Sequence, residues 1–179
     1  GNYFPFSLVY RFHHGLLMRN SVEMLRIIDI KGYQFSMLID LRNGFVDKQL
    51  YLKGVYEENV SNLIASKLNK GDTFIDVGAN IGYFTLLSSM IVQEEGKVFS
   101  FEPVSNTYEK LRKNIELNKV NNILFEKYGV GNQNQKKKIN YSDENLGHSS
   151  ILNNNDLERK NENEEIKITA STDSLTKEF

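Results

Sequence analysis

A strand, a glycine-containing loop and a helix follow one another in residues 73–84, and no other segment constrains the fold as much. Strand-forming residues lead into Asp76, and a turn of small residues separates this acid from an amphipathic helix. Gly78 and Gly82 lack a Cβ and adopt unusual φ values readily, so a ligand can lie directly against the main chain. The segment therefore predicts a binding loop at the end of a parallel strand.

A second acid follows at the spacing that such a site requires. Residues 98–101 read as another strand, and this strand ends at Glu102, about twenty residues after the loop. In a doubly wound sheet this carboxylate lies beside the first loop, where it can accept hydrogen bonds from ribose hydroxyls. The loop and the acid together predict a ligand that contains adenosine.

The loop sequence narrows the class of nucleotide. It reads G-x-N-x-G, which lacks the G-x-G-x-x-G of dinucleotide sites and the Gly-Lys-Ser/Thr of a P-loop. The carboxylate of Asp76, two residues before the first glycine, disfavours pyrophosphate and suits a ligand that bears an ammonium and a sulfonium. A structural role is the alternative, in which Asp76 accepts N–H bonds from its own loop.

The pattern D-x-G-x-N-x-G followed by F-E-P resembles the cofactor loop of class I S-adenosylmethionine-dependent methyltransferases. With residues 54–58 and 70–85 included, the chain resembles the FkbM family, most closely over residues 50–130. The resemblance implies a Rossmann-like fold, S-adenosylmethionine as cofactor and O-methylation of a sugar or secondary metabolite. Family members continue from a T-L-D-x-L segment into a K-I-D-V-E-G strand. Residues 171–175 resemble the former and the chain stops at Phe179, so we expect a C-terminally truncated domain.

The order of predicted elements gives an α/β fold: a Rossmann-like, mostly parallel sheet with flanking helices and an N-terminal antiparallel β extension. We place an N-terminal arm and β meander in residues 1–54 and the cofactor-binding domain in residues 55–179. Residues 56–69 predict a helix whose apolar face carries Val60, Leu63, Ile64 and Leu68. Residues 136–141 predict a weak strand, residues 153–165 a polar surface excursion, and residues 166–169 a further strand.

Composition removes several function classes. The net charge of −1 gives no electrostatic case for binding duplex nucleic acid or anionic membrane. No run of about eighteen apolar residues exists, so we expect no membrane span. The absence of cysteine excludes disulfides and thiolate metal sites and fits a reducing, cytoplasmic location. His13 and His14 have no acid or cysteine at metal-ligand spacing, so we predict no metal site.

The predicted cofactor-binding residues come from the loop, the two strand ends and the segment before the first helix. They are Tyr56, Glu57, Asp76, Gly78, Ala79, Asn80, Gly82, Tyr83, Glu102, Val104, Tyr128 and Gly129. The resemblance implies that the loop residues wrap the methionine part of the cofactor. Packing is the alternative for Tyr56, Tyr83 and Val104, and a helix-dipole contact is the alternative for Glu57.

His148, in a polar loop, is the predicted catalytic base, because a hydroxyl acceptor must lose a proton and histidine titrates in the useful range. A solvated loop histidine is the alternative. The expected partner is a small-molecule acceptor, for which a carbohydrate is one candidate, and we expect no nucleic acid partner. Self-association is also expected, because an open sheet edge would need covering. Two other functions stay open: a non-catalytic cofactor-binding or interaction module, and a nicotinamide-dependent oxidoreductase.

Overall fold

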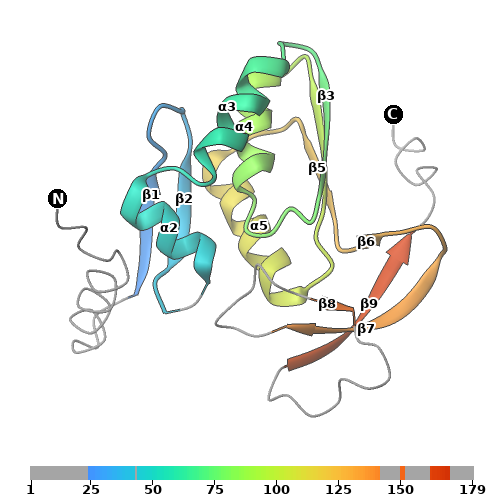
Figure 1. Ribbon diagram of the computed structural model, residues 1–179. Coiled ribbons are helices and arrows are strands. Elements are labelled where there is room, and N and C mark those ends of the chain that lie inside the picture. The colour runs from blue at the N-terminus through green and yellow to red at the C-terminus, as the bar shows by residue number, and fades with distance from the viewer. Residues whose placement is uncertain (1–23, 43, 142–149, 152–161, 170–179) are drawn as a thin grey trace, which may run out of the picture.

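The computed structural model describes residues 24–42, 44–141, 150–151 and 162–169. Figure 1 shows the arrangement of the helices and strands. In chain order they are β1 Leu25–Asp29, β2 Ser36–Asp40, α2 Phe45–Lys53, α3 Glu58–Lys67, β3 Thr73–Val77, α4 Tyr83–Val92, β4 Lys97–Phe101, α5 Ser105–Asn118, β5 Ile123–Glu126, β6 Gly129–Val130, β7 Gln135–Tyr141, β8 Ser150–Ile151 and β9 Glu162–Thr169.

The predicted parallel sheet is confirmed. β3, β4 and β5 pair in that order, and both pairings are parallel, with Ile75 opposite Phe99 and Phe99 opposite Leu124. Helices α4 and α5 are the crossovers between these strands, and together with α3 they lie on one side of the sheet (Figure 1). Their buried residues include Leu86 on α4 and Leu111 on α5. The α/β, Rossmann-like fold class therefore holds.

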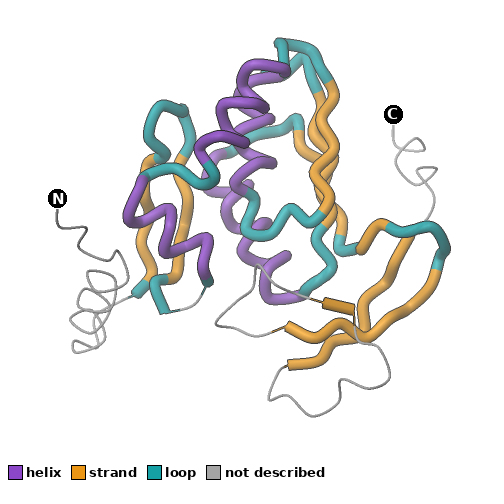
Figure 2. The backbone as a smooth tube through the Cα atoms, in the orientation of Figure 1, coloured by secondary structure: helices purple, strands orange, loops and turns teal. Residues whose placement is uncertain are grey.

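The N-terminal part is a hairpin followed by a helix, so the prediction of a meander was wrong for residues 45–53. β1 and β2 pair antiparallel, and Gly44 precedes α2 with φ 89°. Val46 and Leu50 are spaced four residues apart and are both buried, which is the helical period. Figure 2 shows α3, α4 and α5 standing between this hairpin and the parallel sheet.

Helix α3 is present as predicted, but its apolar face is only partly covered: Ile64 packs against the core, while the fully buried residue of the helix is polar. Val60 is 38% exposed and Leu63 is 56% exposed, whereas Ser61 is completely buried. The Ser61 hydroxyl lies 3.1 Å from the Tyr83 hydroxyl and donates to the main-chain oxygen of Tyr56 at 2.7 Å. Polar contacts of Ser61 therefore add to the packing of Ile64 in fixing α3 against the core, and the apolar period did not indicate them.

Strands between residues 129 and 169 form a further, four-stranded sheet in the order β6-β9-β7-β8. The predicted strand at residues 136–141 is confirmed as most of β7, which pairs antiparallel with β9. β9 begins at Glu162, so the predicted polar excursion is wrong for residues 162–165. Lysines on β7 stabilise this acidic half of β9, since Lys138 lies opposite Glu165 and Lys136 Nζ is 2.9 Å from Glu165 Oε1.

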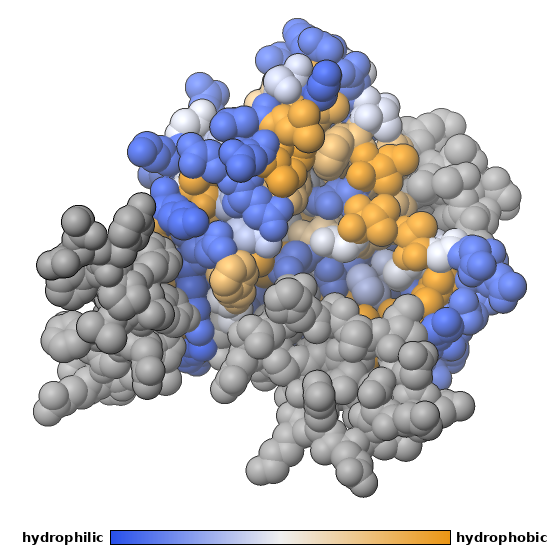
Figure 3. Space-filling view, viewed as in Figure 1, coloured by the Kyte–Doolittle hydropathy of each residue, from blue (hydrophilic) through white to orange (hydrophobic). Residues whose placement is uncertain are grey.

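The outer edge of β3 has no paired strand among the residues that the structure describes. Ile75 and Val77 are 53% and 58% exposed on this strand, although parallel strands are usually buried on both faces. Figure 3 shows apolar side chains exposed around this part of the molecule. None of the described helices is long and apolar enough to cross a membrane.

Candidate functional site

The candidate site lies where β3 and β4 end and where residues 78–82, the cofactor loop, lead into α4. The amides of Gly78 and Ala79 both donate to Phe101 O, at 2.8 and 3.0 Å. The amide of Asn80 donates to Glu102 Oε2 at 2.9 Å. These three bonds hold the loop against the end of β4, so the loop and the strand-end acid are neighbours, as the strand order requires.

Three residues of the cofactor loop have left-handed backbone conformations. Gly78, Asn80 and Gly82 have φ values of 82°, 52° and 92°. The amide of Ile81 donates to Asn80 Oδ1, and that of Gly82 donates to Ala79 O. With the bonds to β4, all five N–H groups of residues 78–82 have acceptors within the protein. The loop is thus preformed, with its donors engaged.

The two loop glycines have different surroundings. A Cβ on Gly78 would meet no atom within 4 Å, so open space lies beside this residue. A Cβ on Gly82 would lie 2.6 Å from Leu111 Cδ1, because the loop packs tightly on α5. Ala79 is buried on the same side, in a cluster with Leu111 and Ile115. Gly78 therefore leaves room for a ligand, whereas Gly82 and Ala79 hold the loop on the helix.

Glu102 is the best-positioned polar group of the site. Its residue is 6% exposed, and its two carboxylate oxygens accept from the amides of Asn80 and Val104 at 2.9 and 3.0 Å. Burial raises the pKa of Glu102 above its usual range, while these two N–H bonds act in the opposite direction. The main chain is fixed as well, because the Glu102 amide donates to Glu126 O on β5 at 3.1 Å.

Asp76 turns toward α4. Its Oδ2 accepts a 2.6 Å bond from the Thr85 hydroxyl, which also lies 2.9 Å from Ser100 Oγ. Burial raises the pKa of Asp76, and the side-chain and backbone bonds from Thr85 lower it. These contacts are structural, but they are not the loop contacts of the alternative stated above, because the donor lies on α4 and the N–H groups of residues 78–82 have other acceptors. A contact between Asp76 and a cofactor stays a prediction.

Tyr56 and Tyr83 belong to an aromatic group behind the cofactor loop. Tyr83 is 2% exposed, and its ring centroid lies 5.9 Å from that of Tyr56 and 5.7 Å from that of Phe35. Burial raises the pKa of Tyr56 to about 12, with a further contribution from the neighbouring Glu57 carboxylate. Glu57 has φ 41° and directly precedes α3. The rings of both tyrosines pack against each other, the Tyr83 hydroxyl is paired with Ser61, and cofactor roles for Tyr56, Glu57 and Tyr83 stay predictions.

The predicted adenine-side residues lie at the junction with the C-terminal sheet. Val104 is buried in a cluster with Ile139, Ile166 and Ile168. Gly129 begins β6 and pairs with Ile168 of β9. Tyr128 lines a cavity of about 270 Å³ with Pro103, Glu126, Lys127 and residues 165–167 of β9. Of these three residues, only Tyr128 lines this cavity, which also contains Pro103, the residue after Glu102, and their adenine contacts stay predictions.

Sequence reasoning missed the contact that brings β9 to this site. Glu164 Oε2 accepts from the Ser105 amide at 2.9 Å, and Glu164 Oε1 contacts the Ser105 hydroxyl and lies 3.1 Å from Lys127 Nζ. A carboxylate at the first residue of α5 is stabilised by the helix dipole. No local pattern could have revealed it, because 59 residues separate Glu164 from Ser105.

Several predicted residues lie outside the described part of the chain. They are His13, His14, His148 and residues 171–175. The proposed base and the chain-end motif therefore stay predictions. Among the residues that are described, no three histidines, aspartates or glutamates come together as metal ligands.

Comparison with known proteins bears on this site. The methyltransferase FkbM domain matches residues 76–179, more than half of the chain, including the loop, Glu102 and the C-terminal sheet. The chain belongs to this family. The family match confirms the resemblance to the FkbM family that the sequence predicted, and it supports S-adenosylmethionine as the cofactor.

Individual relatives match shorter parts of the chain. A probable cobalt-precorrin-6B C(15)-methyltransferase (decarboxylating) from Sulfurisphaera tokodaii is 35% identical over 69 residues, which are 38% of this chain and 36% of that protein. The chain thus matches about a third of the length of this curated relative.

Solved structures resemble part of the fold. M. jannaschii TYW2 in complex with AdoMet has a TM-score of 0.46 and 24% identity, over 59% of this chain and 44% of that one. A putative rRNA-methylase from Clostridium thermocellum has a TM-score of 0.38 and 25% identity, over 40% and 39%. A complex of aTrm5 with tRNALeu has a TM-score of 0.45 and 22% identity, over 59% and 28%. Likeness at this level gives no information about the methyl acceptor.

Proposed function

We propose that this chain binds S-adenosylmethionine at Glu102 and the cofactor loop, and acts in methyl transfer to a hydroxyl of a small molecule such as a sugar or secondary metabolite. The observation that carries the proposal is the position of Glu102, which is buried at the end of β4 and bonded to the amide of Asn80 in the loop. Membership of the FkbM family supports the cofactor and the reaction class.

The chemistry of Glu102 fits a ribose diol. A carboxylate has about four acceptor positions, and the described residues use two of them, through the amides of Asn80 and Val104. About two positions remain for a pair of ribose hydroxyls. Beside this acid, the open space at Gly78 would let a ligand lie against the main chain without meeting a side chain.

The protein's part in such a reaction is binding, orientation and exclusion of water. Glu102 would fix the ribose, Gly78 would allow close approach, and the cavity at Tyr128 would accept the adenine. S-adenosylmethionine, when bound, supplies the methyl group for in-line displacement by an acceptor oxygen. His148 is our candidate for the group that takes the hydroxyl proton.

Titration calorimetry with S-adenosylmethionine and its thioether product tests the proposal. Wild-type protein should bind both, and Glu102→Ala should lose most of the affinity. Glu95→Ala is the matched control, because Glu95 is an exposed acid near the other end of β4 and pairs with Lys70. Absence of binding to the wild-type protein would refute the proposed function, and so would equal loss in the two variants.

A nicotinamide-dependent oxidoreductase is the less favoured reading. A pyrophosphate is normally bound by free N–H groups at the start of a helix, whereas the five N–H groups of residues 78–82 already have acceptors. Quenching of intrinsic fluorescence by NADH would support that reading, and its absence would support ours.

A cofactor-binding or interaction module is the second candidate, and the exposed apolar residues of β3 favour it. Light scattering together with a methyl-transfer assay distinguishes the enzyme from the module. A strict monomer with full methyl-transfer activity excludes the module. That nucleic acid is not the acceptor, and that the protein acts in the cytoplasm, also remain proposals. A gel-shift assay with tRNA tests the first.

A further inference from the structure

Two asparagines one turn apart on α5 bond to the main chain of β2. Asn118 Oδ1 accepts from the Ser36 amide at 2.9 Å, and its Nδ2 donates to Ser36 O at 2.8 Å. Asn114 Oδ1 accepts from the Leu38 amide at 2.7 Å. The free edge of the hairpin is thereby bonded to a helix by side-chain amides, in place of a third strand.

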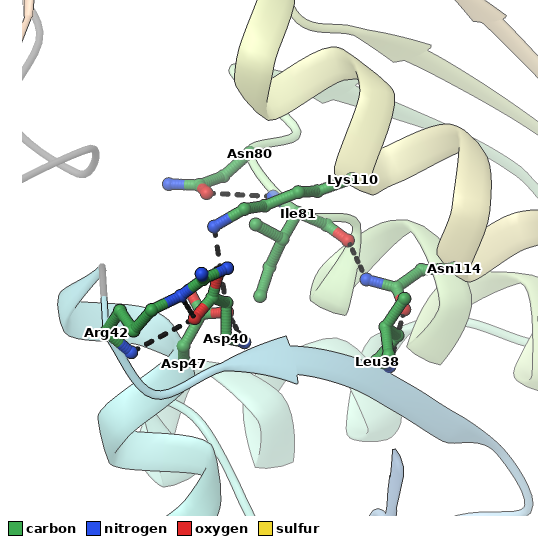
Figure 4. Close-up of polar contacts among 8 residues, drawn as sticks. All are labelled: Leu38, Asp40, Arg42, Asp47, Asn80, Ile81, Lys110 and Asn114. Carbon is green, nitrogen blue, oxygen red and sulfur yellow. Dashed lines mark hydrogen bonds and ion pairs between the residues drawn. The ribbon is translucent and has the colours of Figure 1, made fainter. Parts of the chain in front are cut away.

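Asn114 makes one contact that Asn118 does not. Its Nδ2 donates to the main-chain oxygen of Ile81, in the middle of the cofactor loop, at 2.8 Å. Figure 4 shows the Asn114 amide between Leu38 and Ile81. Asn114 is completely buried, so water cannot replace either bond at low cost. One side chain therefore joins the hairpin to the loop.

The position of Ile81 is important for the proposed site. Its neighbour Asn80 has φ 52° and donates its amide to Glu102, the proposed ribose acceptor. Its other neighbour, Gly82, has φ 92°. Left-handed φ values on both sides of Ile81 are unfavourable for most residues and persist only where surrounding contacts hold them, and the carbonyl bond to Asn114 is one such contact. The Ile81 side chain is 1% exposed and packs in one core cluster with Met37 and Ile39 of β2.

We propose that Asn114 is a positioning residue for the cofactor loop, and that through it the hairpin of β1 and β2 helps to set the affinity for S-adenosylmethionine. This inference rests on the proposed function. The hairpin lies before residue 76, where the family match begins. It would therefore affect the ligand affinity of a loop inside the matched domain although it lies outside the matched residues. Because coupling is reciprocal, bound ligand must also stabilise the hairpin contact.

Asn114→Ala and Asn118→Ala form a matched pair, since both remove an amide bonded to β2 and only the first removes the bond to Ile81. Measured by calorimetry well below each unfolding temperature, Asn114→Ala should weaken binding of the thioether product about fivefold to tenfold. Asn118→Ala should change it by less than about twofold. Equal affinities for the two variants would overturn the proposal.

Hydrogen exchange on the wild-type protein tests the coupling without a variant. Saturating thioether product should slow exchange at the Leu38 amide at least about fivefold more than at the Ser36 amide, because only the former is bonded to Asn114. Equal slowing would report overall stabilisation alone and would overturn the proposal. If the wild-type protein bound no ligand, the proposed function itself would fail, which is a distinct result.

Discussion

Substitution of the two loop glycines by alanine should separate folding from ligand binding. Gly78 and Gly82 have similar φ values, 82° and 92°, so alanine pays a similar backbone cost at either position, about 1–2 kcal/mol. The surroundings differ. An added Cβ meets nothing within 4 Å at Gly78 but lies 2.6 Å from Leu111 Cδ1 at Gly82.

Leu111 is fully buried, so it cannot move aside without disturbing the cluster that it shares with Ala79 and Ile115. Overpacking of this kind costs about 1–3 kcal/mol. With the backbone cost added, Gly82→Ala should lower the free energy of unfolding by about 2–5 kcal/mol, and Gly78→Ala by only about 1–2 kcal/mol. Urea denaturation of the two variants beside the wild-type protein measures the difference.

Ligand affinity should follow the opposite order. If the cofactor lies against Gly78, the alanine methyl group occupies its space, so calorimetry should show a large loss for Gly78→Ala. The folded fraction of Gly82→Ala should lose less affinity than Gly78→Ala, since its Cβ points into α5 and not into the open space beside Gly78. Equal unfolding free energies for the two variants, or stronger binding by Gly78→Ala than by Gly82→Ala, would refute this reasoning.

Three further predictions concern the buried carboxylates. Burial raises the pKa of Glu102, so as the pH is lowered this carboxylate is protonated, and cofactor affinity falls, at a higher pH than for an ordinary glutamate. Calorimetry on Glu102→Gln should show no such pH dependence. Thr85→Val should cost about 1.5–3 kcal/mol in urea denaturation, since it removes a bond to the Asp76 carboxylate, whereas Thr85→Ser should cost less; equal losses would contradict this reason. The Arg42 side chain lowers the pKa of Asp40, so the stability that this pair contributes is present above the ordinary aspartate pKa and is lost as the pH falls through the lowered value. Arg42→Ala should therefore be less stable than wild type near neutral pH and equal to it in acid, and a difference that persists in acid would exclude this ion pair as its cause.

The central fold could be predicted because its signals are local. The loop glycines, the helix that follows them and the strand that ends at Glu102 are all contained in short segments, and the parallel order follows from their alternation. That Glu102 and Asn80 lie next to each other follows from that strand order. These elements carry most of the candidate site.

The remaining features depend on contacts that sequence spacing does not show. Asn114 and Asn118 bond to residues 76 and 82 positions away, and their role as an edge for β2 has no local signature. Ser61 is buried on α3 because the Tyr83 hydroxyl lies beside it. Asp76 was expected to face a ligand, and only the position of Thr85 in space reveals that it bonds to α4.

Because every N–H group of residues 78–82 already has an acceptor, the loop can select against phosphate-bearing ligands without charge repulsion by Asp76. A phosphate that approached residues 78–82 would find no vacant amide donor there, and it would have to break existing bonds to acquire one. A ligand that bears hydroxyl groups donates hydrogen bonds itself, so it needs only an acceptor, and the Glu102 carboxylate is one. Discrimination of this kind would persist at high ionic strength, where long-range electrostatic selection fades.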